Sequence, residues 1–305
     1  MEEFGLQLSE RKVSDWIAGD FSPLSSKIIN PNGIWLTPEV EYQNRWGYDR
    51  MACVTYSLLN CIETLYYYKT GVARNFSDRF LAKMSGTTKI GNSLDTVFDT
   101  ARKIGLVDES VYPDTQGGWE EYYKEVPQEI QNIAKDFLGT WELYREWIKT
   151  DDKDAIFNAL KEAPLQVVVC YASGNGYLNP TGKYNHAVML YGAEYGKCWY
   201  IFDHYTQSIK TYAWDYEFDC VLKPSLILKE NKPMTTLKDN TLCQLVQSTG
   251  GFGLYLEGKM IVDDLDKILA SWLVRTKGKT DGMVATMTLE EWDKIPKINL
   301  KSQPI

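Results

Sequence analysis

The sequence predicts an α+β protein in which helices precede a sheet, and three observations support this class. Between residues 53 and 163 the apolar residues recur at helical spacing, in segments that end near Gly or Pro. From residue 165 onward, runs rich in β-branched and aromatic residues follow one another without a helical period. Turns containing Gly or Asn separate these runs, which favours antiparallel pairing. The order of the elements therefore indicates two lobes, one helical and one built on a sheet.

Each expected helix has its own start or stop signal. The longest begins at Cys53, where irregular chain becomes periodic, and it stops at Thr70-Gly71, a normal helix end. Two of the others begin at capping serines and one has a proline in its first turn, and all of them end at glycine or before proline. The expected helices cover 53–69, 77–84, 93–104, 127–138 and 152–163, and the expected strands cover 165–172, 186–194, 198–205 and 208–214.

Composition shifts divide the chain into three parts. Residues 1–40 form an irregular N-terminal extension in which prolines and Asn32-Gly33 mark turns. Residues 41–228 form the main domain. Residues 229–305 form a small C-terminal α+β accessory module, which opens with the polar linker KENKPMTTLKDN, contains no histidine and is a possible site for a protein partner. Its expected elements are strands at 241–247, 252–262 and 282–287, a helix at 263–275 and a capping box at 288–291.

The charge balance limits the classes of partner. Lys and Arg number 33 and Asp and Glu number 41, so the net charge is −8. An acidic chain without a basic patch does not suit nucleic acid or an anionic membrane. The first residues, MEEFGLQLSERK, lack the apolar core of a signal peptide, and no apolar run approaches the length of a membrane span. We expect a cytoplasmic or virion-associated protein.

The cysteines are spread out and include no C-x-x-C pair, which makes zinc ribbons and thioredoxin-type motifs unfavourable. We therefore expect free thiols, no metal and no cofactor. The chain has only two histidines, His186 and His204, so an imidazole base must be one of them. Cys53 lies at a helix start, where the macrodipole favours a thiolate. A buried structural cysteine and a satisfied core histidine are the alternatives for these positions.

A Cys-His-Asp set is the chemistry that these positions favour together. His186 begins one expected strand and Asp203 lies on the next, so a hairpin can bring them together. A carboxylate there can hold the imidazole by Nδ1–H and leave Nε2 for the thiol of Cys53. Because strands alternate faces, His204 is expected to point away from Asp203.

The order of these residues resembles the papain-like cysteine peptidases. The resemblance implies a two-lobed fold, a helical lobe plus an antiparallel β-barrel-like lobe, with the active site in the cleft between them. It covers roughly residues 40 to 225 and rests on several soft motifs in register. The motifs are CVTYS at Cys53–Ser57, GLVDESVYP at Gly105–Pro113, ALKEAPLQV at Ala159–Val167, NHAVMLYG at Asn185–Gly192 and WYIFDHY at Trp199–Tyr205.

The resemblance also implies roles for individual residues. Cys53 would be the nucleophile, His186 the general base and acid, and Asp203 the orienting residue, where the family has asparagine. Gln43 would complete the oxyanion hole, although it lies ten residues before Cys53 and not a few. Contacts to substrate are expected at Gly91 and Asn92, which resemble the family's cleft-lining glycines, and at Asn185. The divergent motifs suggest a bacterial or virus-encoded relative.

Three functional classes follow. The first is a cysteine peptidase that hydrolyses a protein or peptide substrate through an acyl-enzyme. The second is a weakly active or inactive papain-fold protein with a structural or interaction role in an assembly such as a virus particle, since the chain has 20 Tyr, 10 Trp and 10 Phe. The third is an amide-transferring enzyme of the transglutaminase type. An added amine nucleophile would distinguish the third from the first.

Overall fold

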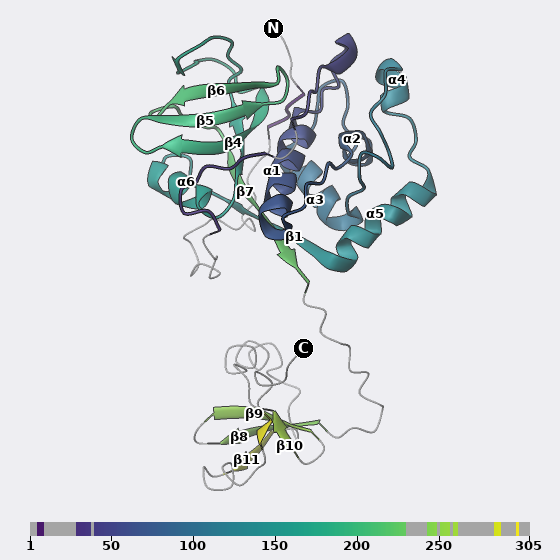
Figure 1. Cartoon of the computed structure of the whole chain (residues 1–305), viewed down its shortest axis with the longest axis vertical. Coiled ribbons are helices and arrows are strands. Elements are labelled where there is room, and N and C mark those ends of the chain that lie inside the picture. The colour runs from purple at the N-terminus through teal and green to yellow at the C-terminus, as the bar shows by residue number, and fades with distance from the viewer. Residues whose placement is uncertain are drawn as a thin grey trace. The chain divides into compact units, whose positions relative to one another are not determined.

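The computed structural model describes residues 5–8, 29–37 and 40–229, together with five strand segments farther along the chain. The chain divides into two compact units, Met1–Glu230 and Asn231–Ile305. Figure 1 shows the first unit as a group of helices beside a sheet. Within the described residues, no helix is both long enough and apolar enough to cross a membrane.

Most helices of the first unit lie to one side of the longest helix, α1. The observed helices are α1 (Cys53–Thr70), α2 (Asp78–Met84), α3 (Leu94–Ile104), α4 (Gly118–Tyr122), α5 (Gln128–Thr140) and α6 (Lys153–Leu160), preceded by the 3-10 turn η1 (Arg45–Gly47). All five expected helices are confirmed. The expected caps form, since Ser77 and Ser93 accept hydrogen bonds from the backbone of α2 and α3. Asp152 also caps α6, which sequence analysis did not predict.

The first unit also contains a seven-stranded sheet with the order β1-β7-β2-β4-β5-β6-β3. All neighbouring pairs are antiparallel except β3 and β6. Sequence analysis missed β1 and β7, which pair with each other at the edge of the sheet. The strands are β1 (Trp141–Trp147), β2 (Leu165–Val169), β3 (Tyr177–Leu178), β4 (His186–Glu194), β5 (Cys198–Asp203), β6 (Ser208–Ala213) and β7 (Val221–Leu228).

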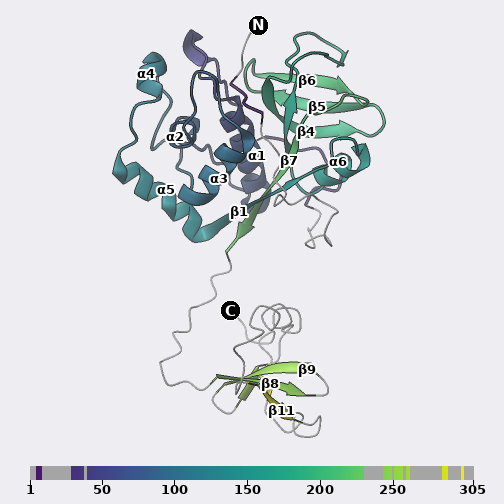
Figure 2. The same cartoon turned by 180° about the vertical axis from the view of Figure 1, so that it is seen from behind.

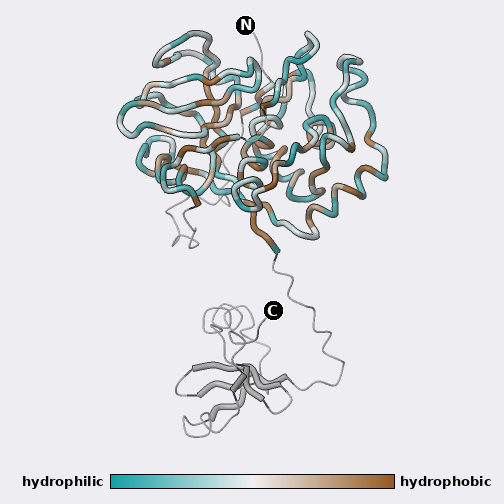
Figure 3. The backbone as a smooth tube through the Cα atoms, in the orientation of Figure 1, coloured by the Kyte–Doolittle hydropathy of each residue, from teal (hydrophilic) through white to brown (hydrophobic). Residues whose placement is uncertain are grey.

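Helix α1 lies between the sheet and helices α2, α3 and α5, whereas α6 lies against the sheet near β4, as the views from the front and from behind both show (Figures 1 and 2). Its first thirteen residues are all buried, so the helix is enclosed on every side over most of its length. The largest hydrophobic cluster joins α1 to β2, β4, β5 and β7 and to Trp35, from the expected N-terminal extension. Figure 3 shows hydrophobic stretches along these inner strands. Cys53 is a member of this cluster.

The second unit contains a five-stranded sheet with the order β11-β8-β9-β10-β12. The expected strand at 252–262 is two strands, β9 and β10, which pair antiparallel as a hairpin. The expected helix at 263–275 and capping box at 288–291 lie outside the described residues. The strands are β8 (Cys243–Ser248), β9 (Gly251–Leu256), β10 (Lys259–Ile261), β11 (Val284–Met287) and β12 (Lys297–Ile298).

A cluster of buried carboxyl groups lies beside α1. The Glu41 carboxylate accepts a hydrogen bond of 2.8 Å from the side chain of Asn60, and it also hydrogen-bonds Asp78. Burial raises the pKa of Glu41 to about 7, against these two hydrogen bonds, and the charge of Glu109 raises it further. Burial likewise raises the pKa of Glu109 to about 7. These groups therefore keep their protons in the folded chain at pH values where an exposed glutamate has lost its own.

We expect the Glu41→Gln variant to gain stability relative to the wild type as the pH rises from about 5 to about 8. Folded Glu41 holds its proton up to about pH 7, whereas the unfolded chain releases it near 4.5. Its contribution to stability is therefore complete below 4.5 and is lost as the pH rises to 7. Glutamine cannot release a proton. Melting temperatures at several pH values check this, with the exposed Glu217→Gln as a control; an equal trend in both variants would contradict it.

Candidate active site

Cys53 is the first residue of α1 and is completely buried. The chain reaches it through Met51, which has the positive φ of 51°, and the Met51 N–H donates to the Asp49 carboxylate at 2.7 Å. The Cys53 thiol lies against β4, because the Ala187 backbone N–H hydrogen-bonds its sulfur. Ala187 follows His186 directly, so this contact brings the start of α1 to the start of β4.

Burial raises the pKa of the Cys53 thiol, and the charges of Asp49 and Asp203 raise it further, while the Ala187 and Val54 N–H groups oppose the shift. The expectation that the helix start favours a thiolate is therefore wrong for this conformation. The reason is that a fully buried thiol loses more solvation of its anion than the first turn of a helix restores.

The structure brings His186 and Asp203 together. His186 Nε2 lies 2.9 Å from Asp203 Oδ1, and both side chains are buried. The expected bond through Nδ1 is therefore wrong. Met189 pairs with Phe202, so the β4–β5 register continues to place Asp203 opposite Val188, two residues from His186 on the same face. The backbones of such a diagonal pair are about 7 Å apart. Nε2, the ring nitrogen farther from the backbone, is therefore the one that reaches Asp203.

Asp203 accepts two further hydrogen bonds that sequence analysis did not anticipate. The Tyr205 N–H donates to Oδ1 at 3.0 Å, and the Lys210 ammonium donates to Oδ2 at 2.5 Å. Burial by itself would raise the pKa of Asp203, but His186 and then Lys210 outweigh it and hold this pKa below its usual range. A signal for Lys210 was present in SIKTYA, where alternation places Lys210 and Tyr212 on one face and Ile209 on the other.

Alternation along the strand predicted that His204 points away from Asp203, but its ring lies beside the His186–Asp203 pair. Strand β5 ends at Asp203, so His204 lies in the following turn, where alternation no longer applies. Its buried ring lies 5.5 Å from the His186 ring and stacks on Tyr56 at 5.4 Å between centroids. Burial, assisted by His186, lowers the pKa of His204 to about 3. His204 is therefore a neutral neighbour of His186.

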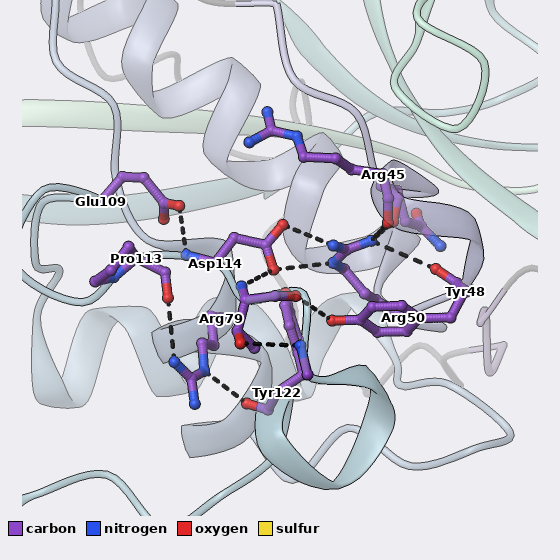
Figure 4. A network of polar contacts seen from close by, with 11 residues as sticks. Arg45, Tyr48, Arg50, Arg79, Glu109, Pro113, Asp114 and Tyr122 are labelled. Atoms are coloured by element: carbon purple, nitrogen blue, oxygen red, sulfur yellow. Dashed lines mark hydrogen bonds and ion pairs between the residues drawn. The ribbon is translucent and has the colours of Figure 1, made fainter.

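Gln43 lies in the loop before α1 and is completely buried. Its Nε2 donates to the Asp49 carboxylate at 2.8 Å, and its backbone N–H donates to the His204 carbonyl at 3.0 Å. The Arg50 guanidinium holds this loop by donating to the carbonyls of Gln43, Arg45 and Tyr48. Figure 4 shows Arg50 between these groups and the carboxylate of Asp114. An amide carries two N–H groups, so the bond to Asp49 leaves Gln43 a second donor.

An N-terminal segment, Gly5–Leu8, lies on two of the residues expected to bind substrate. The Gln7 N–H donates to the Asn92 carbonyl at 2.7 Å, and the Asn92 N–H donates to the Gly5 carbonyl at 3.0 Å. The Gln7 side chain also donates to the Gly91 carbonyl at 2.9 Å. Asn92 thus pairs with the backbone around Leu6 as a parallel β-bridge, and the Gly91 carbonyl binds the Gln7 side chain.

Asn185, the third residue expected to bind substrate, supports the neighbouring backbone. Its side-chain oxygen accepts from the Tyr171 N–H at 3.0 Å, and its own N–H donates to the Val169 carbonyl at 3.2 Å. It therefore ties the ends of β2 and β4 together beside His186. Within the described residues, no group of three or more His, Cys, Asp and Glu side chains could hold a metal ion.

Comparisons with known proteins agree with this architecture. No protein-family model and no curated protein matches the chain significantly. The proform of the ragweed pollen cysteine protease Amb a 11 matches with a TM-score of 0.50 at 16% identity, over 62% of this chain and 61% of that one. The digestive procathepsin L 3 of Tenebrio molitor larval midgut matches with a TM-score of 0.50 at 16% identity, over 69% of this chain and 73% of that one.

These likenesses show that the chain has a papain-like fold, as the resemblance in sequence implied. The chain spans less than two thirds of the length of the ragweed protein.

Proposed function

We propose that this protein is a cysteine peptidase that cleaves peptide bonds through an acyl-enzyme on Cys53. One observation carries the proposal. His186 forms a buried pair with Asp203, and the next residue, Ala187, hydrogen-bonds the Cys53 thiol through its backbone N–H. Cys53 would attack the amide carbonyl. His186, held at Nε2 by Asp203, would accept the thiol proton at Nδ1 and pass it to the leaving amine.

Two groups would stabilise the oxyanion of the tetrahedral intermediate. One is the Cys53 backbone N–H at the start of α1, and the other is the second N–H of the Gln43 amide. Gly91 and Asn92 would bind the backbone of an extended peptide, as they bind residues 5–7 of the chain itself. The Gly5–Leu8 segment occupies the backbone of Gly91 and Asn92, so a peptide substrate would have to displace it to bind there.

Alkylation followed by peptide mapping tests the proposal. We expect a peptidyl epoxide to modify Cys53 in preference to the other five cysteines, and to abolish hydrolysis of an unstructured protein such as casein. The Cys53→Ala variant should lack both activities, whereas Cys61→Ala, at an equally buried position inside α1, should retain them. Equal modification of all six cysteines would contradict the proposal, and so would hydrolysis that survives in the Cys53→Ala variant.

A papain-fold protein with an interaction role and no hydrolysis is the second candidate. The complete burial of Cys53 and its raised pKa favour it, because neither suits a nucleophile in the observed conformation. It predicts that no substrate is cleaved even when the Gly5–Leu8 segment has been displaced.

A further inference from the structure

We propose that Lys210 is a positioning residue of this site, which cancels the charge of Asp203 so that the His186–Asp203 pair behaves as if its carboxylate were neutral. The inference rests on the proposed function, because it assigns Lys210 a part in the Cys53–His186 chemistry. Neither the family resemblance nor the comparisons point to this lysine, and sequence analysis did not select it.

The Lys210 ammonium is buried and has three partners. Its ammonium donates to Asp203 Oδ2 at 2.5 Å and to the Ala172 carbonyl at 2.6 Å, and it lies 4.2 Å from the centre of the Tyr171 ring. The side chain is only 7% exposed. All three partners lie at the end of the sheet where His186 begins β4, and the Tyr171 ring also packs edge-on against the His186 ring.

Strand β6, which carries Lys210, buries a lysine and exposes an isoleucine, the reverse of the usual preference of these side chains. Asp203 pairs with Ser208 across the β5–β6 hairpin, which puts Lys210 two residues farther along the same face. Lys210 is buried, while its neighbour Ile209 is 69% exposed. Exposing an isoleucine and burying an ammonium both cost free energy. The contacts of the Lys210 ammonium with Asp203, Ala172 and Tyr171 offset this cost.

The charges around His186 show what Lys210 does. The rings of Tyr171, His204 and Tyr205 lie within 6.0 Å of the His186 ring. The charge of Asp203 acts on the Cys53 thiol and on Tyr212. Farther out, Tyr56 stacks on His204, and Asp49 acts on Cys53. His204 is neutral because burial lowers its pKa to about 3. Lys210 is the cation that contacts Asp203. Without it, a bare buried carboxylate would favour the imidazolium form of His186 and oppose a thiolate on Cys53.

Removing Lys210 should therefore raise the pKa values of both Cys53 and His186. The pH dependence of Cys53 alkylation should then move to higher pH. We expect Lys210→Met to shift the pH profile of Cys53 alkylation upward by about one pH unit or more, the size of one charge interaction at this range inside a protein. Lys210→Arg, which keeps the charge, should restore the profile. The double variant Asp203→Asn with Lys210→Met should also return toward the wild-type profile, because a neutral amide needs no cation.

The exposed Lys197→Met, at the β4–β5 turn, is the matched control and should leave the profile unchanged. If Lys210→Met fails to fold, a folded double variant with a near wild-type profile still supports the charge pairing. A Lys210→Met profile equal to the wild type, or a double variant shifted as far as Lys210→Met, would overturn the role of Lys210. A wild type that shows no preferential labelling of Cys53 would instead overturn the proposed function.

Discussion

Replacing Arg50 by methionine should destabilise the first unit by about 3–5 kcal/mol, the usual cost of removing one partner from a buried ion pair. The Arg50 side chain is fully buried, and its guanidinium lies 2.7 Å from the carboxylate of Asp114. It also donates to three backbone carbonyls and lies 4.5 Å above the Tyr48 ring. Methionine fills much of the space but leaves Asp114 and these carbonyls without their donor.

Urea denaturation of the wild type and the variant measures the change in the free energy of unfolding. Arg102→Met is the control, since Arg102 and Asp99 form an exposed pair on α3, 53% and 42% exposed, and should cost less than about 1 kcal/mol. A loss in Arg50→Met no greater than in Arg102→Met would show that the loop holds without this guanidinium. The loop carries Gln43 and leads to Cys53, so alkylation of Cys53 should also change in Arg50→Met.

Replacing Gly5 by valine should raise the rate of Cys53 alkylation at least about tenfold, a change that corresponds to about 1.4 kcal/mol in the opening equilibrium. Gly5 is buried with a φ of 90°, which disfavours a side chain. A Cβ on Gly5 would lie 2.2 Å from the carbonyl carbon and oxygen of Met51, two residues before Cys53. The backbone of Met51 cannot yield by that amount, so the segment should detach and free the chain that leads into Cys53.

The rate of modification by iodoacetamide, followed at Cys53 by peptide mapping, checks this prediction. Leu8→Ala is the matched control within the same segment, because the Leu8 side chain is 53% exposed and should have little effect. Equal rates in the Gly5→Val and Leu8→Ala variants would show that the Gly5–Leu8 segment does not limit access to Cys53.

Local patterns predicted the helices and the inner strands well. Capping residues, glycine stops and apolar spacing act within a few residues, so the start of α1 at Cys53 and the ends of α2 and α3 follow from neighbouring residues. Helix α6 ends at Leu160, three residues before the expected end at 163. The order of Cys53, His186 and Asp203 along these elements was also visible. Strand β1 was missed because its partner, β7, lies about 80 residues away, and only that pairing makes WELYREW a strand.

The atoms that meet at the site were not predictable in the same way. Which ring nitrogen of His186 faces Asp203 depends on the β4–β5 register, and the approach of His204 depends on where β5 ends. The bond from Gln43 to Asp49 depends on the path of a loop that Arg50 holds from within.

The amino-acid sequence by itself therefore determined the α+β class, the position of Cys53 at a helix start and the pairing of His186 with Asp203. These follow from short-range periodicity and from a hairpin between consecutive strands. Only the tertiary structure decided that Lys210 neutralises Asp203, that Gly5–Leu8 lies on Gly91 and Asn92, and that the Cys53 thiol is buried. Burial and charge depend on every element that packs around a side chain, and most of those elements are distant in the chain.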